Sequence, residues 1–142
     1  MKFPQHPALQ ARQHALSEYL LILPDASERL NALVSHAARQ TGLSEEEKIP
    51  PHRVEGCVSM VWIVGGCEHG LCFFRSAADS SLVAGLVGAM AELCSGLSPE
   101  ELEHLDLSWL ENAGLWNQIS PTRQRGLSAV AESIRNFAAS CH

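Results

Sequence analysis

The apolar positions in the first third of the chain recur at nearly helical spacing up to Pro24. These positions are Leu9, Leu16, Leu20 and Leu23. Asp25 is followed three residues later by Glu28, which is the arrangement of a helix capping box, and a second apolar face runs through residues 30–37. We therefore predict an N-terminal helical hairpin within residues 1–43.

The pattern changes after the polar segment 44–53, whose double proline predicts an extended loop rather than a helix. "VSMVWIV" is rich in β-branched residues, "GGCEHG" reads as a turn, and "LCFFRS" supplies a second apolar run. We predict an antiparallel β-hairpin with its cysteine loop over residues 54–77, with a possible third short pairing at Val54. Both faces of "VWIV" are apolar, so helices should cover at least one side of the sheet.

Helical spacing returns in residues 80–140, where Ser98 and Ser120 each precede a proline in the manner of a helix start. Helices on either side of a small hairpin predict an α+β fold, in which N-terminal and C-terminal helices cover a small antiparallel sheet. The length fits a single domain over residues 1–142.

Charge and hydropathy narrow the class of partner. Asp and Glu outnumber Lys and Arg by 16 to 10, and the basic residues are scattered, which argues against binding to nucleic acid. No apolar run reaches the roughly 18 residues that a membrane span requires, and the start lacks the apolar stretch of a secretory signal. We expect a soluble, cytoplasmic protein that does not associate with membranes.

The five cysteines are an odd number in a chain without a recognisable export signal, so we expect most of them to be reduced thiols. Cys94 lies beside the apolar stripe of a predicted helix and should be a core or border thiol. Cys141 is the penultimate residue, and we expect it to be frayed and exposed.

Cys67 and Cys72 flank the predicted hairpin turn, with His69 between them. A structural zinc site uses four ligands, so these cysteines would need a second pair, which Cys57 and His52 could supply. The simpler interpretation is that Cys67 and Cys72 are buried or half-buried hairpin residues without a metal.

Cys57 follows a glycine at the end of a proline-rich loop, just before an apolar run. A glycine gives the backbone freedom beside the thiol, and Arg53 supplies nearby positive charge that would favour the thiolate. From spacing alone, Cys57 is either a reactive thiol or a small structural residue.

Three separated segments match one known family. "VEGCVSMVWIV" resembles the Gly-Cys-x-Ser-x-Val-Trp signature of the SufE family, sulfur acceptors for cysteine desulfurases in iron–sulfur cluster assembly. "ADSSLVAGLVGAM" is similar to that family's middle-helix start, and "ISPTRQRGLSAVAESIR" to its final helix. "YLLILPDASERLNALVSHA" occupies the place of the family's N-terminal hairpin. The resemblance covers nearly the whole chain and implies a fold of the SufE/IscU type.

The resemblance implies that Cys57 accepts sulfur as a persulfide. The other positions that match the family's motifs are Gly56, Ser59, Trp62, Asp79 and Arg123. By this resemblance Asp79 and Arg123 would position the loop or contact a partner. For Gly56, Ser59 and Trp62 we expect loop flexibility, a local hydrogen bond and core packing, respectively.

The same resemblance implies two partners, a cysteine desulfurase that donates sulfur and is stimulated by its removal, and an iron–sulfur scaffold that receives it. Pyridoxal phosphate would belong to the desulfurase, and we expect no cofactor in this chain, which should be a monomer or weak homodimer. The chain departs from the family's usual glutamines at Val58 and Met60. We expect loop 50–58 to shelter the thiol at rest and to move outward on docking.

The residues also allow two alternative functions. One is a small thiol redox or zinc-binding module that uses Cys57, Cys67 and Cys72. The other is an interaction domain that keeps the fold without transferring sulfur.

Overall fold

The computed structural model describes residues 6–141. Helices α1 (Leu9–Ile22) and α2 (Ala26–Ala38) form the predicted N-terminal hairpin. Asp25 caps α2, because its side chain accepts a hydrogen bond from the Glu28 N–H at 2.9 Å. Within the described part of the chain, no helix has the length and apolar character needed to cross a membrane.

The predicted β-hairpin consists of β1 (Val61–Glu68) and β2 (Leu71–Ala78), which pair in antiparallel register. The turn is shorter than expected and contains only His69 and Gly70. Both residues have positive φ, 53° and 78°, as a two-residue type I′ turn requires. The other residues of the predicted turn lie within β1, because a two-residue turn leaves them free to pair with β2.

The first strand begins later than predicted, and residues 58–60 stay in the loop after Cys57. One further hydrogen bond, from the Asp79 N–H to the Met60 carbonyl at 3.1 Å, continues the pairing at this end before the chain turns into the next helix. The third pairing expected at Val54 is a single contact, in which the Val54 N–H donates to the Val61 carbonyl at 2.9 Å. An isolated bridge between Arg53 and Trp62 adjoins it.

The segment before Cys57 is not extended as predicted. It forms two 3-10 turns, η1 (Glu45–Glu47) and η2 (Pro50–His52). Ser44 and Glu47 make a reciprocal capping box around η1, and proline occupies the first position of η2, so local capping outweighs the extended preference. Glu47 also forms an ion pair with Arg75 of β2, which fixes this segment over the sheet and lowers the pKa of the Glu47 carboxyl to about 2.

The C-terminal half is helical, as predicted. It contains α3 (Ser81–Cys94), α4 (Pro99–Leu102), α5 (Ser108–Asn112), η3 (Trp116–Gln118) and α6 (Pro121–Ala139). Ser98 and Ser120 each accept a hydrogen bond from a backbone N–H three residues on, which confirms the predicted helix starts, and Ser80 caps α3 in the same way.

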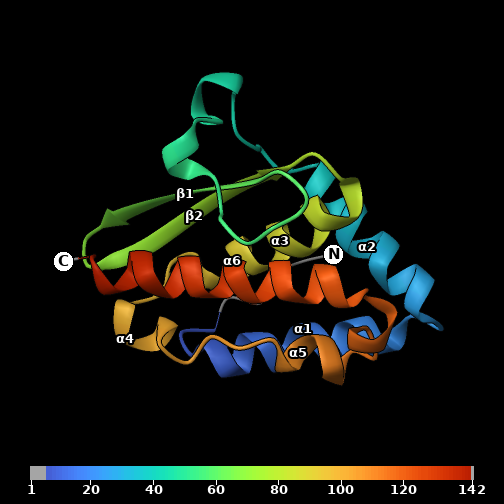
Figure 1. The fold of residues 1–142 in the computed structure, drawn as a ribbon. Helices are drawn as coiled ribbons and strands as arrows, with labels where there is room; N and C mark the ends of the chain where they lie inside the picture. Colours follow the sequence, from blue (N-terminus) through green and yellow to red (C-terminus); the bar gives the residue numbers. More distant parts are fainter. Residues whose placement is uncertain (1–5, 142) are drawn as a thin grey trace.

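The elements form layers, with the hairpin on one side, α3 and α6 beneath it, and α1 and α5 beyond them (Figure 1). The buried Arg12 of α1 joins the layers, since its guanidinium donates to the carbonyls of Leu93 (3.0 Å) and Ser95 (2.8 Å) at the end of α3. The chain therefore has the α+β architecture that its apolar pattern predicts.

Candidate functional site

Cys57 lies in the loop between η2 and β1, where Gly56 adopts a φ of 88° that favours glycine. The thiol is half-buried against α6, and its Sγ donates a weak hydrogen bond to the Gly126 carbonyl at 3.4 Å. Gly126 is itself buried, and a Cβ at this position would stand 3.5 Å from the sulfur. An alanine would therefore fit here at ordinary van der Waals distance, whereas a longer side chain would extend toward the sulfur.

A pocket of about 260 Å³ opens beside the thiol, between the cysteine loop, α3 and the first turns of α6. Its walls are mostly aliphatic, while hydroxyl groups and one guanidinium come from the start of α6. The lining residues are Cys57, Val58, Ser59, Val61, Val83, Leu86, Val87, Ser120, Thr122, Arg123, Gly126, Leu127 and Val130. Cys57 is thus a nucleophile candidate that lies on a cavity rather than on a flat surface.

The surroundings of Cys57 act on its ionisation in opposite directions. Burial raises the pKa of the Cys57 thiol above its ordinary value, and the positive charge of Arg53 partly offsets this. The neutral thiol is therefore favoured in the resting protein, and any event that exposes the sulfur would favour the reactive thiolate.

The structure brings together some of the predicted site residues and separates others. Ser59 and Arg123 line the same pocket as Cys57, and Gly56 is adjacent in the loop. Asp79 is exposed just after β2 and does not line the pocket. Trp62 is half-buried outside the core cluster, contrary to the expected core packing, because it lies on the sheet face covered by the 44–53 segment, with the Lys48 ammonium 5.7 Å from its ring centroid.

The residue after the cysteine is an exposed apolar side chain. Val58 is 82% exposed, although it is next to a half-buried thiol. Met60, the other departure from the family pattern, is half-buried. Val58 thus extends the apolar rim of the pocket to the molecular surface.

Sequence reasoning gave no role to Gly126 or Thr122. Both lie in the "SPTRQRGL" segment, where the available signal was a glycine that interrupts an otherwise helical pattern. A glycine in a helix interior weakens the helix, and a Cβ here would stand at ordinary van der Waals distance from Cys57, so the contact limits this position to a small residue without requiring glycine.

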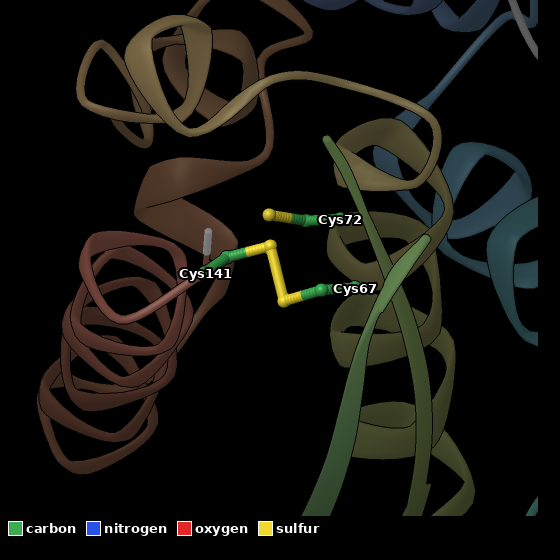
Figure 2. A group of neighbouring side chains, drawn as sticks. All are labelled: Cys67, Cys72 and Cys141. Carbon is green, nitrogen blue, oxygen red and sulfur yellow. A yellow bond between two sulfur atoms is a disulfide. The ribbon is translucent and has the colours of Figure 1, made fainter. Parts of the chain in front are cut away.

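The remaining cysteines form a separate group at the other end of the hairpin. Cys141 is not frayed and exposed as predicted, since it is 6% exposed and forms a disulfide with Cys67 (Figure 2). Three of the five cysteines, Cys57, Cys72 and Cys94, are free thiols, in agreement with the prediction that most are reduced. Cys67 and Cys141 are the exceptions, because the residues after α6 bring Cys141 to β1. Cys72 is buried beside the disulfide, as expected for a hairpin residue, whereas Cys67 is exposed at the end of β1, contrary to the expectation that both would be buried or half-buried.

The other two cysteines stay apart from this group. Cys94 is fully buried in the core, where burial raises the pKa of its thiol to about 12. Among the described residues, the group of neighbouring metal-ligating side chains contains Cys67, Cys72 and Cys141. The pairing with Cys57 and His52 considered from the sequence does not occur, because His52 in η2 and Cys57 in the following loop precede β1, whereas Cys67 lies near its end.

Comparison with known proteins agrees with the motif resemblance. Residues 14–138 match the SufE family, described as a Fe-S metabolism associated domain. An uncharacterised SufE-like protein of Synechocystis sp. is 32% identical over 114 residues, which cover 80% of this chain and 72% of that protein. A chloroplastic quinolinate synthase of Oryza sativa subsp. japonica is 34% identical over 67% of this chain, but the match spans only 14% of that protein.

A solved structure shares the fold. The solution structure of a hypothetical protein from Thermus thermophilus matches with a TM-score of 0.75, covering 90% of this chain and 93% of that one at 21% identity. The arrangement of helices around the hairpin is therefore found in a distant sequence as well. With a family match across nearly the whole described chain and a relative above 30% identity, this chain belongs to the SufE family of domains associated with Fe-S metabolism.

Proposed function

We propose that this protein is a sulfur acceptor, in which Cys57 takes persulfide sulfur from a cysteine desulfurase and passes it on for iron–sulfur cluster assembly. The observation that carries the proposal is the position of Cys57, half-buried on a loop at the edge of an apolar pocket. Membership of the SufE family supports the link to Fe-S metabolism.

The chemistry is thiol–persulfide exchange. The Cys57 thiolate attacks the terminal sulfur of a persulfide on the donor's cysteine, forming a new S–S bond at Cys57. The S–S bond in the donor breaks, and the donor cysteine leaves as a thiolate. The step is redox-neutral, and it leaves a persulfide on Cys57 without requiring a cofactor in this chain. Pyridoxal phosphate would act in the desulfurase.

The pocket supplies shelter for the product. Its volume of about 260 Å³ is several times the roughly 30 Å³ that one water molecule occupies in the liquid, so an added sulfur atom fits beside Cys57. The aliphatic walls from α3 and α6 would exclude water and polar reductants from the terminal sulfur. Ser59 and Arg123 line the same pocket, where they would contact an anionic persulfide.

Transfer requires the thiol to meet a sulfur on another protein. Val58, which is exposed beside Cys57, is suited to an apolar contact with the desulfurase. Docking that draws the loop away from Gly126 would also relieve the burial that disfavours the thiolate. The same loop could then return the persulfide to the pocket before delivery to a scaffold protein.

Mass spectrometry of cysteine-containing peptides tests the proposal. The purified protein is incubated with a cysteine desulfurase and cysteine, then digested without reductant. We expect one added sulfur atom on the Cys57 peptide, lost in Cys57→Ser and retained in Cys72→Ser, together with faster cysteine turnover by the desulfurase only when Cys57 is present. Added sulfur on the Cys72 peptide alone, or none on Cys57, would overturn the proposal.

A further inference from the structure

Three cysteine sulfurs meet at the end of the hairpin, away from the Cys57 pocket. The Sγ atoms of Cys67, Cys72 and Cys141 all lie within 4.8 Å of one another. Figure 2 shows the three side chains pointing toward a common centre, with Cys72 next to the disulfide between the other two. The disulfide requires only two of these residues, so the third thiol needs an explanation.

The sheet register places Cys72 beside Cys67. The two residues are direct cross-strand partners. The Cys72 N–H donates to the Leu97 carbonyl at 2.8 Å, and the Cys72 carbonyl accepts from the Gly96 N–H at 2.7 Å, so the backbone of Cys72 bonds outward rather than to Cys67. The pair is therefore of the non-hydrogen-bonded kind, in which side chains on one face approach most closely.

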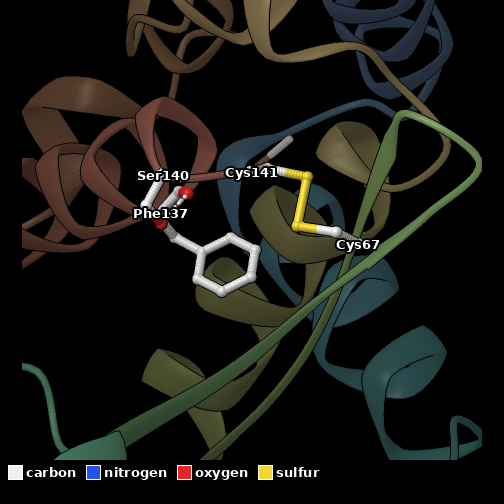
Figure 3. The surroundings of a disulfide bond; sticks show 4 residues. All are labelled: Cys67, Phe137, Ser140 and Cys141. Atoms are coloured by element: carbon white, nitrogen blue, oxygen red, sulfur yellow. Dashed lines mark hydrogen bonds between the residues drawn. A yellow bond between two sulfur atoms is a disulfide. The ribbon is translucent and has the colours of Figure 1, made fainter.

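The end of α6 brings the third sulfur to the same face. The Phe137 ring occupies the space above Gly65, where a Cβ would lie 2.8 Å from the ring, and it packs edge-on against Phe74. α6 ends at Ala139, and the two residues after it continue along the hairpin. The chain therefore contacts β1 first through Phe137 at Gly65 and then through Cys141 at Cys67, two residues further along the strand (Figure 3).

We propose that, in the reduced protein, Cys67, Cys72 and Cys141 bind one thiophilic divalent cation of the Zn²⁺ type. Thiolates at about 2.3 Å from a tetrahedral zinc stand about 3.8 Å apart, and the three sulfurs already lie within 4.8 Å of one another. Small side-chain movements suffice to place all three around one ion. Soft sulfur ligands favour Zn²⁺ over Mg²⁺ or Ca²⁺.

The three cysteines of the proposed site differ in solvent exposure. Cys72 and Cys141 are buried, whereas Cys67 is exposed at the hairpin edge. The ion would therefore be held from the protein side by two sheltered thiolates, with its fourth position directed to solvent and filled by water or an added ligand. Binding releases the protons of the three thiols, so affinity should rise with pH.

The bound metal and the Cys67–Cys141 disulfide are alternative links between the end of α6 and β1. Oxidised glutathione can accept the two electrons: the Cys67 and Cys141 thiolates form the disulfide, and glutathione leaves as two thiolates. Two of the three ligands are lost in that step, and the cation is released. Either state ties the end of α6 to the hairpin, and only the reduced state uses Cys72.

The metal content of the reduced chain tests the site. The protein is reduced with a phosphine in the absence of metal, then titrated with Zn²⁺ and examined by native mass spectrometry. We expect one Zn²⁺ per chain, and Co²⁺ in its place should show the thiolate charge-transfer and tetrahedral absorption bands. Addition of oxidised glutathione should release the ion as the disulfide forms.

Cys72→Ser is the decisive variant. We expect it to lose stoichiometric Zn²⁺ binding while it still forms the Cys67–Cys141 disulfide, and Cys67→Ser should lose both. Cys57→Ser is the matched control and should bind Zn²⁺ like the unmodified chain, so failure here is distinguishable from failure of the sulfur-acceptor proposal. Circular dichroism verifies that each variant is folded. Absence of Zn²⁺ in the reduced chain, or undiminished binding by folded Cys72→Ser, would overturn the site.

Discussion

Cys57 and Gly126 are in direct contact: the thiol donates to the Gly126 carbonyl at 3.4 Å, and a Cβ on Gly126 would stand 3.5 Å from the sulfur. The residues are 69 positions apart in the chain. The contact links the loop signature and the final-helix motif in one site. It also makes the exposure of the thiol sensitive to the size of one side chain on α6.

Substitution at Gly126 should therefore change the accessibility of Cys57. Gly126→Leu should push the loop outward and speed alkylation of Cys57 by iodoacetamide, measured by peptide mass spectrometry. Gly126→Ala is the control, because its Cβ fits at 3.5 Å and alanine stabilises a helix interior by up to about 1 kcal/mol relative to glycine. A folded Gly126→Leu protein that reacts no faster than the unmodified chain would argue against this contact as the determinant of accessibility.

The alkylation rate of Cys57 should depend on pH in a defined direction. Only the thiolate reacts, and burial raises the pKa of Cys57, so the rate should climb about tenfold per pH unit and level off above the ordinary thiol range. Arg53 lowers this pKa, so Arg53→Gln should shift the profile to higher pH and slow the reaction at neutral pH.

Arg39→Gln removes the same charge from the end of α2 and serves as the control for Arg53→Gln. Its pH profile should coincide with that of the unmodified chain. Equal shifts in the two variants would assign the effect to net charge rather than to the position of Arg53.

Two adjacent glycines in β1 should respond differently to alanine. A Cβ at Gly65 would lie 2.8 Å from the Phe137 ring, so Gly65→Ala should lower the free energy of unfolding by about 1–3 kcal/mol through overpacking. Gly66 faces open space, and Gly66→Ala should change the free energy of unfolding by less than about 0.5 kcal/mol. Urea denaturation gives both values.

A double variant tests the contact itself. Truncating the ring in Phe137→Ala should remove most of the additional cost of Gly65→Ala, which gives a non-zero coupling energy between the two positions. Additive effects would mean that Gly65→Ala acts through the strand backbone instead.

Loss of the disulfide should destabilise the metal-free protein. Cys67 and Cys141 are separated by 74 positions, and a disulfide typically contributes about 2–4 kcal/mol of stabilisation, chiefly through the unfolded chain. With a chelator present, Cys141→Ser should therefore show a lower free energy of unfolding than the oxidised chain. Cys57→Ser should have the same free energy of unfolding as the oxidised chain. Reduction should lower the free energy of unfolding of the unmodified chain and leave that of Cys141→Ser unchanged.

The sequence alone predicted the elements whose signals are local. Asp25, Ser98 and Ser120 mark helix starts because a cap is satisfied by backbone N–H groups within three residues. The apolar spacing of α1, α3 and α6 is repeated often enough to identify their buried faces. Cys57 was recognisable as the sulfur-accepting candidate only because separate motifs agreed with one family.

Tertiary structure decided what depends on contacts between distant segments. The start of β1 at Val61 depends on where β2 ends. The partial burial of Trp62, on the face of the sheet away from the core, depends on the 44–53 segment that covers that face. The pairing of Cys67 with Cys141 depends on the direction of α6 across the sheet, which Phe137 and Gly65 fix. Spacing along the chain carries no information about such contacts, because their energy depends on which surfaces the folded chain brings together.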